Sequence, residues 1–189
     1  MKKIAITGNI ASGKSQVENY LKDKYPVIDT DNISHYLLDK LQDKIIEVFN
    51  DYDITENNKI SRKKLGSIVF KNEILRHKLE SIIHPEIDVE INKFFQDNIF
   101  SNFVFVSIPL LFETHLENQF DKIICVCAND ELRLERLIKR NNLTKEEALY
   151  RINSQMPQKD KIKKSDFVIY NETNISTLHS QIDKILLSL

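Results

Sequence analysis

The chain has 189 residues, of which 41% are hydrophobic, and a formal net charge of −1, which allows one substantial core with a smaller insertion. A nearly neutral chain has no global field for nucleic acid, so any anion site has to be local. No stretch approaches about 18 uninterrupted apolar residues, which excludes a membrane-spanning helix, and Cys125 and Cys127 alternate with apolar residues, which predicts buried, reduced thiols and a cytoplasmic location.

The first predicted unit is a strand, a loop and a helix. The apolar run 4–6 precedes the segment Gly8–Ser15, which reads G-x-x-x-x-G-K-S. In such a loop the backbone N–H groups surround phosphate oxygens, Lys14 neutralises their charge and the Ser15 hydroxyl ligates Mg²⁺. A plain glycine turn before a helix is the alternative, but it would not require Lys14 and Ser15 in register. The pattern therefore predicts a nucleotide site, followed by a helix over 14–23.

A second strand is predicted over 26–28, and it ends in Asp29-Thr30-Asp31. If the chain stays extended, the i, i+2 spacing places both carboxylates on one side. One carboxylate could then orient a Mg²⁺ water while the other accepts a proton from an acceptor hydroxyl. The alternative is that Asp31 caps the next helix.

Residues 32–98 are predicted to form a helical insertion without a convincing strand. Pro85 should kink or restart one of its helices, because proline cannot donate a backbone hydrogen bond. Arg62 and His84 are candidates for binding an anionic acceptor, since arginine suits bidentate phosphate contacts. Exposed or core-satisfied roles stay open for both residues.

The remainder alternates strands with helices. Strands are predicted over 103–108, 122–127 and 166–170, and helices over 130–141, from the capping box Thr144–Glu147, and over 175–189. This alternation implies a parallel sheet with helices on both faces, in which all strand carboxyl ends point toward the phosphates.

Charged side chains on the 130–141 helix have two interpretations. Arg133, Arg136 and Arg140 recur at i, i+3, i+7, which fits a mobile lid that stabilises phosphoryl transfer. A solvated charged face is the alternative. The later lysines at 159, 161, 163 and 164 are predicted to be solvated.

Missing motifs narrow the function. The chain has no D-x-x-G or N-K-x-D of a GTPase, and the strand over 103–108 carries Ser107 where a Walker B aspartate would end it. These absences disfavour a transducing ATPase and favour a small-metabolite kinase.

An ordered set of motifs resembles the dephospho-CoA kinase family over nearly the full length. The set comprises 7–15, 28–31, 60–65 with 69–70, His84-Pro85, Pro109-Leu110-Leu111-Phe112-Glu113, 136–140, Gln155 and 165–171. The resemblance implies a P-loop kinase fold of class α/β: a five-stranded parallel sheet flanked by helices, with a helical substrate-binding insertion and a helical lid. It implies a single kinase domain over 1–189, with a core of about 1–31, 101–132 and 165–189, a CoA subdomain of about 32–100 and a lid of about 133–164.

The resemblance also implies the reaction: ATP with Mg²⁺ phosphorylates the 3′-hydroxyl of dephospho-CoA, the last step of coenzyme A synthesis. The catalytic residues would be Asp31 as base, Lys14, and Arg140 from the lid. The ATP-binding set would be Gly8, Asn9, Ile10, Ala11, Ser12, Gly13, Lys14, Ser15, Gln16, Arg136 and Asn171, with Ser15 also the metal ligand. The acceptor set would be Asp29, Asp31, Arg62, His84, Pro109, Leu110, Leu111 and Glu113.

Two departures from the family pattern stand out. Asn9 and Ala11 occupy loop positions where the family usually has glycine, and Ala11 there requires an ordinary backbone conformation or about 1 kcal/mol of strain. The turn after Asn171 also lacks its usual glycine. A nucleotide or shikimate-type kinase and an ATP-dependent regulatory module are the alternative functions, and the chain is expected to be a monomer or weak homo-oligomer without nucleic-acid or membrane partners.

Overall fold

The computed structural model describes residues 1–189, which divide into two compact units. The first unit combines Met1–Asp29 with Asn98–Leu189, and the second is Thr30–Asp97. Each unit has its own hydrophobic core. None of the helices has the length and apolar character needed to cross a membrane.

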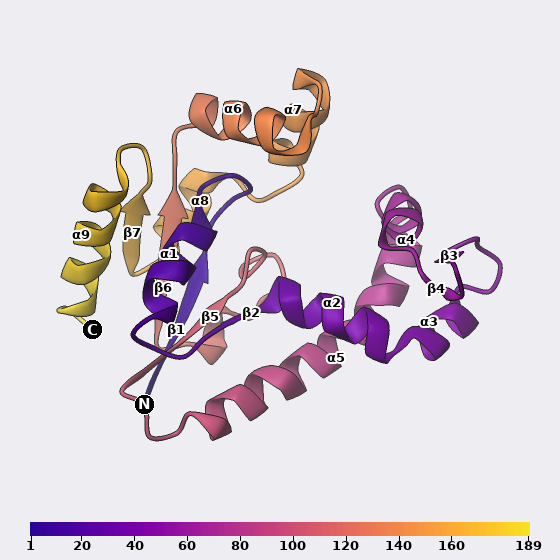
Figure 1. Cartoon of the computed structure of the whole chain (residues 1–189), viewed down its shortest axis with the longest axis horizontal. Helices are drawn as coiled ribbons and strands as arrows, with labels where there is room; N and C mark the ends of the chain where they lie inside the picture. Colours follow the sequence, from indigo (N-terminus) through magenta and orange to yellow (C-terminus); the bar gives the residue numbers. More distant parts are fainter. The chain divides into compact units, whose positions relative to one another are not determined.

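The first unit is built on a five-stranded parallel sheet (Figure 1). Its strands are β1 (Lys2–Thr7), β2 (Val27–Asp29), β5 (Phe103–Ser107), β6 (Lys122–Cys127) and β7 (Phe167–Tyr170), in the order β2-β5-β1-β6-β7. This is the predicted α/β fold class. In the register, Ser107 is the partner of both Ile6 and Asp29, so the ends of three strands meet at one edge of the sheet.

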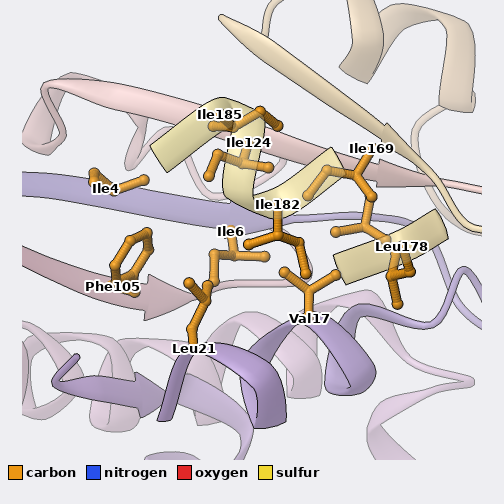
Figure 2. Close-up of a cluster of buried hydrophobic side chains, with 11 residues drawn as sticks. Ile4, Ile6, Val17, Leu21, Phe105, Ile124, Ile169, Leu178, Ile182 and Ile185 are labelled. Atoms are coloured by element: carbon orange, nitrogen blue, oxygen red, sulfur yellow. The ribbon is translucent and has the colours of Figure 1, made fainter. Parts of the chain in front are cut away.

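Two helices supply the apolar layer that covers one face of this sheet (Figure 2). They are α1 (Lys14–Lys22) and α9 (Ile175–Leu186). Val17 and Leu21 of α1 pack with Leu178 and Ile182 of α9 against the buried strand residue Ile6. Because α1 begins directly after the Gly8–Ser15 loop, this packing fixes the loop at the end of β1.

The remaining elements of the first unit lie between β5 and β7 in the sequence. They are η1 (Glu117–Gln119), α6 (Asp130–Asn141), α7 (Lys145–Asn153) and α8 (Gln158–Lys163), of which α6 packs on α7 and α8 packs on β6 (Figure 1). Helix α6 has the predicted bounds. The predicted capping box also forms, because Thr144 and Glu147 exchange side-chain to backbone hydrogen bonds. Both cysteines are buried and free, as predicted.

The second unit contains four helices and a short hairpin. The elements are α2 (Thr30–Lys40), α3 (Gln42–Val48), β3 (Thr55–Glu56), β4 (Lys59–Ile60), α4 (Arg62–Val69) and α5 (Glu73–Asp97). The expectation of no strand in this region is therefore wrong. Asn57 and Asn58 connect β3 to β4 with φ of 52° and 60°, and asparagine adopts such left-handed angles at low cost.

The structure also corrects local expectations at Asp31 and at Pro85. Asp31 lies in the first turn of α2 rather than in an extended chain, so the alternating i, i+2 geometry with Asp29 does not form. At this position the negative charge of Asp31 interacts favourably with the positive end of the helix dipole. Of the kink or restart predicted at Pro85, the restart does not occur, since α5 continues through this residue. Ile82, Ile83 and Ile87 are buried on both sides of Pro85, and their packing offsets the lost backbone hydrogen bond.

Candidate active site

The Gly8–Ser15 loop ends at a glycine that no other residue can replace without distortion. Gly13 is the N-cap of α1 and has φ of 90°. A Cβ at this position would overlap Nδ2 of Asn171, which donates hydrogen bonds to the Ser12 carbonyl and to Oε1 of Gln16, both at 2.9 Å. Since the first N–H groups of a helix have no acceptor within it, the start of α1 is left ready for an anion.

Ala11 is the strained residue of the loop. Its φ is 63°, in the left-handed region, whereas Asn9 is not among the residues with positive φ. Of the two alternatives for Ala11, an ordinary backbone conformation or a strained one, the structure shows the strained one, which costs about 1 kcal/mol. Asn9 instead uses its side chain, because Nδ2 donates to the Met156 carbonyl at 2.8 Å.

Gly13 and Ala11 both have left-handed backbone angles, but substitutions at the two positions are expected to change the stability of the protein by different amounts. Gly13→Ala should lower the free energy of unfolding by about 2 kcal/mol or more, because it adds both strain and overlap. Ala11→Gly should stay within about 1 kcal/mol of wild type, because relief of strain opposes a more flexible unfolded chain. Urea unfolding followed by circular dichroism measures both. Equal stability of Gly13→Ala and wild type would contradict the left-handed conformation of Gly13 and its close contact with Asn171.

The loop is clamped from the segment that was predicted to be a lid. Nε of Arg133 donates to the Ile10 carbonyl at 3.1 Å, and the Ile10 N–H donates to Oε1 of Gln155 at 2.7 Å. Arg133 is 2% exposed and pairs with Asp130 at 2.8 Å. Burial lowers the pKa of the Arg133 guanidinium, and the Asp130 carboxylate opposes that shift. The solvated-face interpretation is therefore wrong for Arg133, which holds the loop backbone.

The other two arginines of α6 differ from each other. Nη2 of Arg136 donates to the Asn171 carbonyl at 3.1 Å, so Arg136 lies beside the residue that contacts Ser12 and Gln16. Arg140 is exposed, and its Nε donates to Oδ1 of Asn141 at 2.9 Å.

Buried polar atoms without a partner concentrate around the loop. The chain has five such side-chain atoms, and four of them belong to the loop or to its arginines: Asn9 Oδ1, Ser12 Oγ, Arg133 Nη2 and Arg136 Nη1. An unpaired buried polar group costs about 1–3 kcal/mol. Such groups persist in clusters where a ligand pairs with them, and here three of the four atoms are able to donate to an anion.

Lys14 lies in a cluster of oxygen atoms from three elements. Its Nζ donates to Oε1 of Glu18 at 2.7 Å and to Oγ of Ser107, and it lies 3.9 Å from Oδ1 of Asp29. Ser107 Oγ in turn donates to Glu18 Oε1 at 2.6 Å. The structure thus brings the predicted residues Lys14 and Asp29 together. It adds Glu18, which the sequence analysis missed although its i, i+4 spacing from Lys14 was a usable signal.

Lys161 contradicts the prediction of a solvated lysine run. It is 0% exposed, and its Nζ donates to the Pro109 carbonyl at 2.7 Å and to Oε2 of Glu113 at 3.0 Å. Glu113 also accepts a hydrogen bond from the Met156 N–H at 3.0 Å. The segment after β5 is therefore tied to the residues that clamp the loop, and the Glu113 carboxylate is occupied by protein partners.

Removing the buried amine is expected to destabilise the first unit. Lys161→Met removes the only cation from the Glu113 carboxylate, which keeps the Met156 N–H, and leaves the Pro109 carbonyl with only the Thr7 hydroxyl at 3.3 Å. This loss should cost about 2–4 kcal/mol in the free energy of unfolding. Lys159→Met, on the exposed side of α8, is the matched control and should change stability by less than about 0.5 kcal/mol. Thermal and urea unfolding measure both variants. A Lys161→Met protein as stable as the control would show that the pair contributes nothing.

The remaining predicted acceptor residues fall into two groups. In the first unit, Leu110 is exposed while Leu111 is fully buried, so only the backbone of Leu111 is available to a ligand. In the second unit, Arg62 is exposed, pairs with Asp39 at 3.1 Å and donates to the His35 carbonyl at 3.3 Å. His84 and Asp31 are exposed on α5 and α2.

Comparison with known proteins gives one consistent family. The family model described as dephospho-CoA kinase matches residues 2–177. Dephospho-CoA kinases of Listeria innocua and Bacillus anthracis are each 41% identical to this chain, covering 96% and 97% of it and 94% of their own lengths. A dephospho-CoA kinase structure from Campylobacter jejuni is 32% identical with a TM-score of 0.76, and covers 98% of this chain and 96% of that one.

Two further solved structures resemble this chain to different degrees. A protein of Thermus thermophilus superposes with a TM-score of 0.91 at 30% identity, over 99% of this chain and 96% of that one. A shikimate kinase from Bacteroides thetaiotaomicron superposes over 100% of this chain and 99% of that one, with a TM-score of 0.51 and 16% identity. The second likeness shows a shared fold alone.

Proposed function

The chain belongs to the dephospho-CoA kinase family, and from this membership we propose how its own residues carry out the family's reaction. The family consists of ATP-dependent phosphotransferases that act on dephospho-CoA in the final step of coenzyme A synthesis, and this chain is such an enzyme. The observation that carries the residue assignment is the group of unpartnered polar atoms around the phosphate loop.

We assign the donor half of the site to the loop and its neighbours. The N–H groups at the start of α1 and the Lys14 ammonium would hold the β- and γ-phosphates of ATP. Ser12, Arg133 and Arg136 have unpartnered atoms that would be satisfied by the nucleotide. Asn171, which contacts Ser12 and Gln16, would border the adenine side.

The donor set also fits Mg²⁺. The Ser15 hydroxyl lies in the first turn of α1, and the carboxylates of Glu18 and Asp29 approach Lys14, so hard oxygen ligands of the kind magnesium prefers are present. Ser15 would hold the ion. Bound with ATP, Mg²⁺ would neutralise charge on the β- and γ-phosphates.

We assign the acceptor half to the second unit and to the segment after β5. Asp31 would accept the proton of the ribose 3′-hydroxyl as that oxygen attacks the γ-phosphorus and the bond to the β,γ-bridging oxygen breaks, which releases ADP. Chain connectivity keeps Asp31 two residues from the end of β2. Arg62 and His84 would bind the anionic acceptor, residues 32–100 would form its subdomain, and Arg140 would act from a lid of about 133–164.

The assigned reaction is tested with an acceptor panel. Purified protein with MgATP should convert dephospho-CoA to coenzyme A and should phosphorylate shikimate and nucleoside monophosphates far more slowly. Product formation is followed by chromatography together with ADP release. Absence of coenzyme A, or faster turnover of another acceptor, would reject this function, and ATP binding without any phosphorylated product would favour a regulatory module instead.

A further inference from the structure

Glu18 is a buried carboxylate to which the reaction above gives no role beyond proximity. It lies on α1, is 3% exposed, and its Oε1 accepts hydrogen bonds from Lys14 at 2.7 Å and from Ser107 at 2.6 Å. Burying a carboxylate is costly unless it is paired and hydrogen-bonded. Both partners lie at the phosphate end of the site, which indicates a role connected with the nucleotide.

The position of Ser107 gives that role a chemical meaning. In P-loop enzymes the magnesium of the nucleotide is held by the loop Ser or Thr and by an aspartate at the end of a core strand. Here β5 is adjacent to β1, and Ser107 is its last residue. The strand therefore ends in a hydroxyl, yet the Glu18 oxygen lies 2.6 Å from that hydroxyl. A carboxylate is therefore present at the end of β5, but it is the side chain of Glu18 on α1.

Helix periodicity aligns this carboxylate with the two side chains of the motif. Glu18 follows Ser15 by three residues and Lys14 by four, so it neighbours each of them on the surface of α1. Asp29 is less well placed, because its Oδ1 is 3.9 Å from Lys14 Nζ and lies beyond hydrogen-bond distance. Glu18 is the carboxylate in direct contact with the ammonium.

We propose that Glu18, positioned by Ser107, replaces the strand-end carboxylate of other P-loop enzymes. It holds Lys14 while the nucleotide is absent, and it becomes the carboxylate partner of the nucleotide's magnesium once Lys14 contacts the phosphates. The inference rests on the proposed function for the identity of the nucleotide. The effect of Glu18 on nucleotide affinity therefore depends on the metal, and Ser107 is the positioning residue.

The first test separates this role from simple packing. Glu18→Gln keeps the shape but removes the charge. Calorimetry should show MgADP binding weakened about tenfold, whereas binding of ADP in EDTA should be unchanged or tighter, because Lys14 loses a competing anion. An equal loss in both conditions would indicate a merely structural side chain, and no loss in either would also overturn the proposal.

The second test moves the carboxylate back to the strand. Glu18→Ser should lose the preference for MgADP over ADP, and the double variant Glu18→Ser with Ser107→Asp should recover most of it. Both are checked for native circular dichroism. If the folded double variant binds MgADP no better than Glu18→Ser, the proposal is wrong; if Ser107→Asp prevents folding, the ratio measured for Glu18→Gln decides alone.

Asp183→Asn is the matched control. Asp183 of α9 also contacts α1, because its two carboxylate oxygens lie 2.9 and 2.8 Å from the Tyr20 hydroxyl that donates to them, but it makes no contact with Lys14. Its removal should leave the ratio of MgADP to ADP affinity unchanged. Since these are binding measurements, failure of the wild type to make coenzyme A would reject the function, while the affinity ratio would still judge Glu18.

Discussion

Lys14→Ala is expected to abolish the reaction almost completely, lowering kcat/KM by about 10³-fold or more. Lys14 is the ammonium in register with the phosphate loop, and its Nζ already lies among the Glu18, Asp29 and Ser107 oxygens. Without it, the β- and γ-phosphates would lose the ammonium beside the Glu18 and Asp29 carboxylates, and Mg²⁺ alone would offset their charge. ATP affinity should therefore fall together with turnover.

Steady-state kinetics and nucleotide binding by calorimetry test this expectation. Lys22→Ala is the matched control, because Lys22 is exposed at the other end of α1 and should leave both parameters unchanged. Lys14→Ala also deprives Glu18 of its partner, so its stability has to be measured alongside. A folded Lys14→Ala protein that retains wild-type affinity for ATP would remove Lys14 from the phosphate site.

Asp31→Asn should separate chemistry from binding. If Asp31 accepts the proton of the 3′-hydroxyl, the amide should lower kcat by about 10²-fold or more, because it cannot act as a base. The affinity for ATP should be unchanged, since the nucleotide contacts are assigned to the other unit. Single-turnover measurements with saturating ATP and dephospho-CoA give the chemical rate directly.

The chain offers a control at an equivalent helix position. Asp43 lies exposed in the first turn of α3, as Asp31 does in α2. Asp43→Asn therefore removes the same favourable interaction with a helix dipole, about 0.3–1 kcal/mol, but should leave kcat unchanged. If the two variants have equal turnover, Asp31 is not the base.

The course of the sheet could be predicted because its signals are local. Buried parallel strands are continuous apolar runs, and 103–108 and 122–127 have that character within a residue of the observed bounds. The capping box at Thr144 was predicted for the same reason, since it involves residues three apart. The hairpin over 55–60 was missed because strands of two residues have no periodicity to detect.

The chemistry of individual charged residues was predicted less well. Lys161 was assigned to a solvated run, yet it is fully buried against Glu113, which is 48 residues away in sequence. Arg133 was left between a functional and a solvated role, and it binds the Ile10 carbonyl across 123 residues. Spacing along one helix cannot reveal such partners, because they come from other elements.

By itself the sequence determined the family, the nucleotide loop and the alternation of strands and helices, since motif register and apolar periodicity are properties of neighbouring residues. Only the tertiary structure decided that Ala11 is strained and that Lys161 and Arg133 are buried and bind backbone carbonyls of distant segments. It also decided that Glu18 accepts a hydrogen bond from Ser107 at the end of β5. The reason is physical: burial and hydrogen-bond partners are set by the packing of elements distant in the chain, and these determine what a charged side chain does.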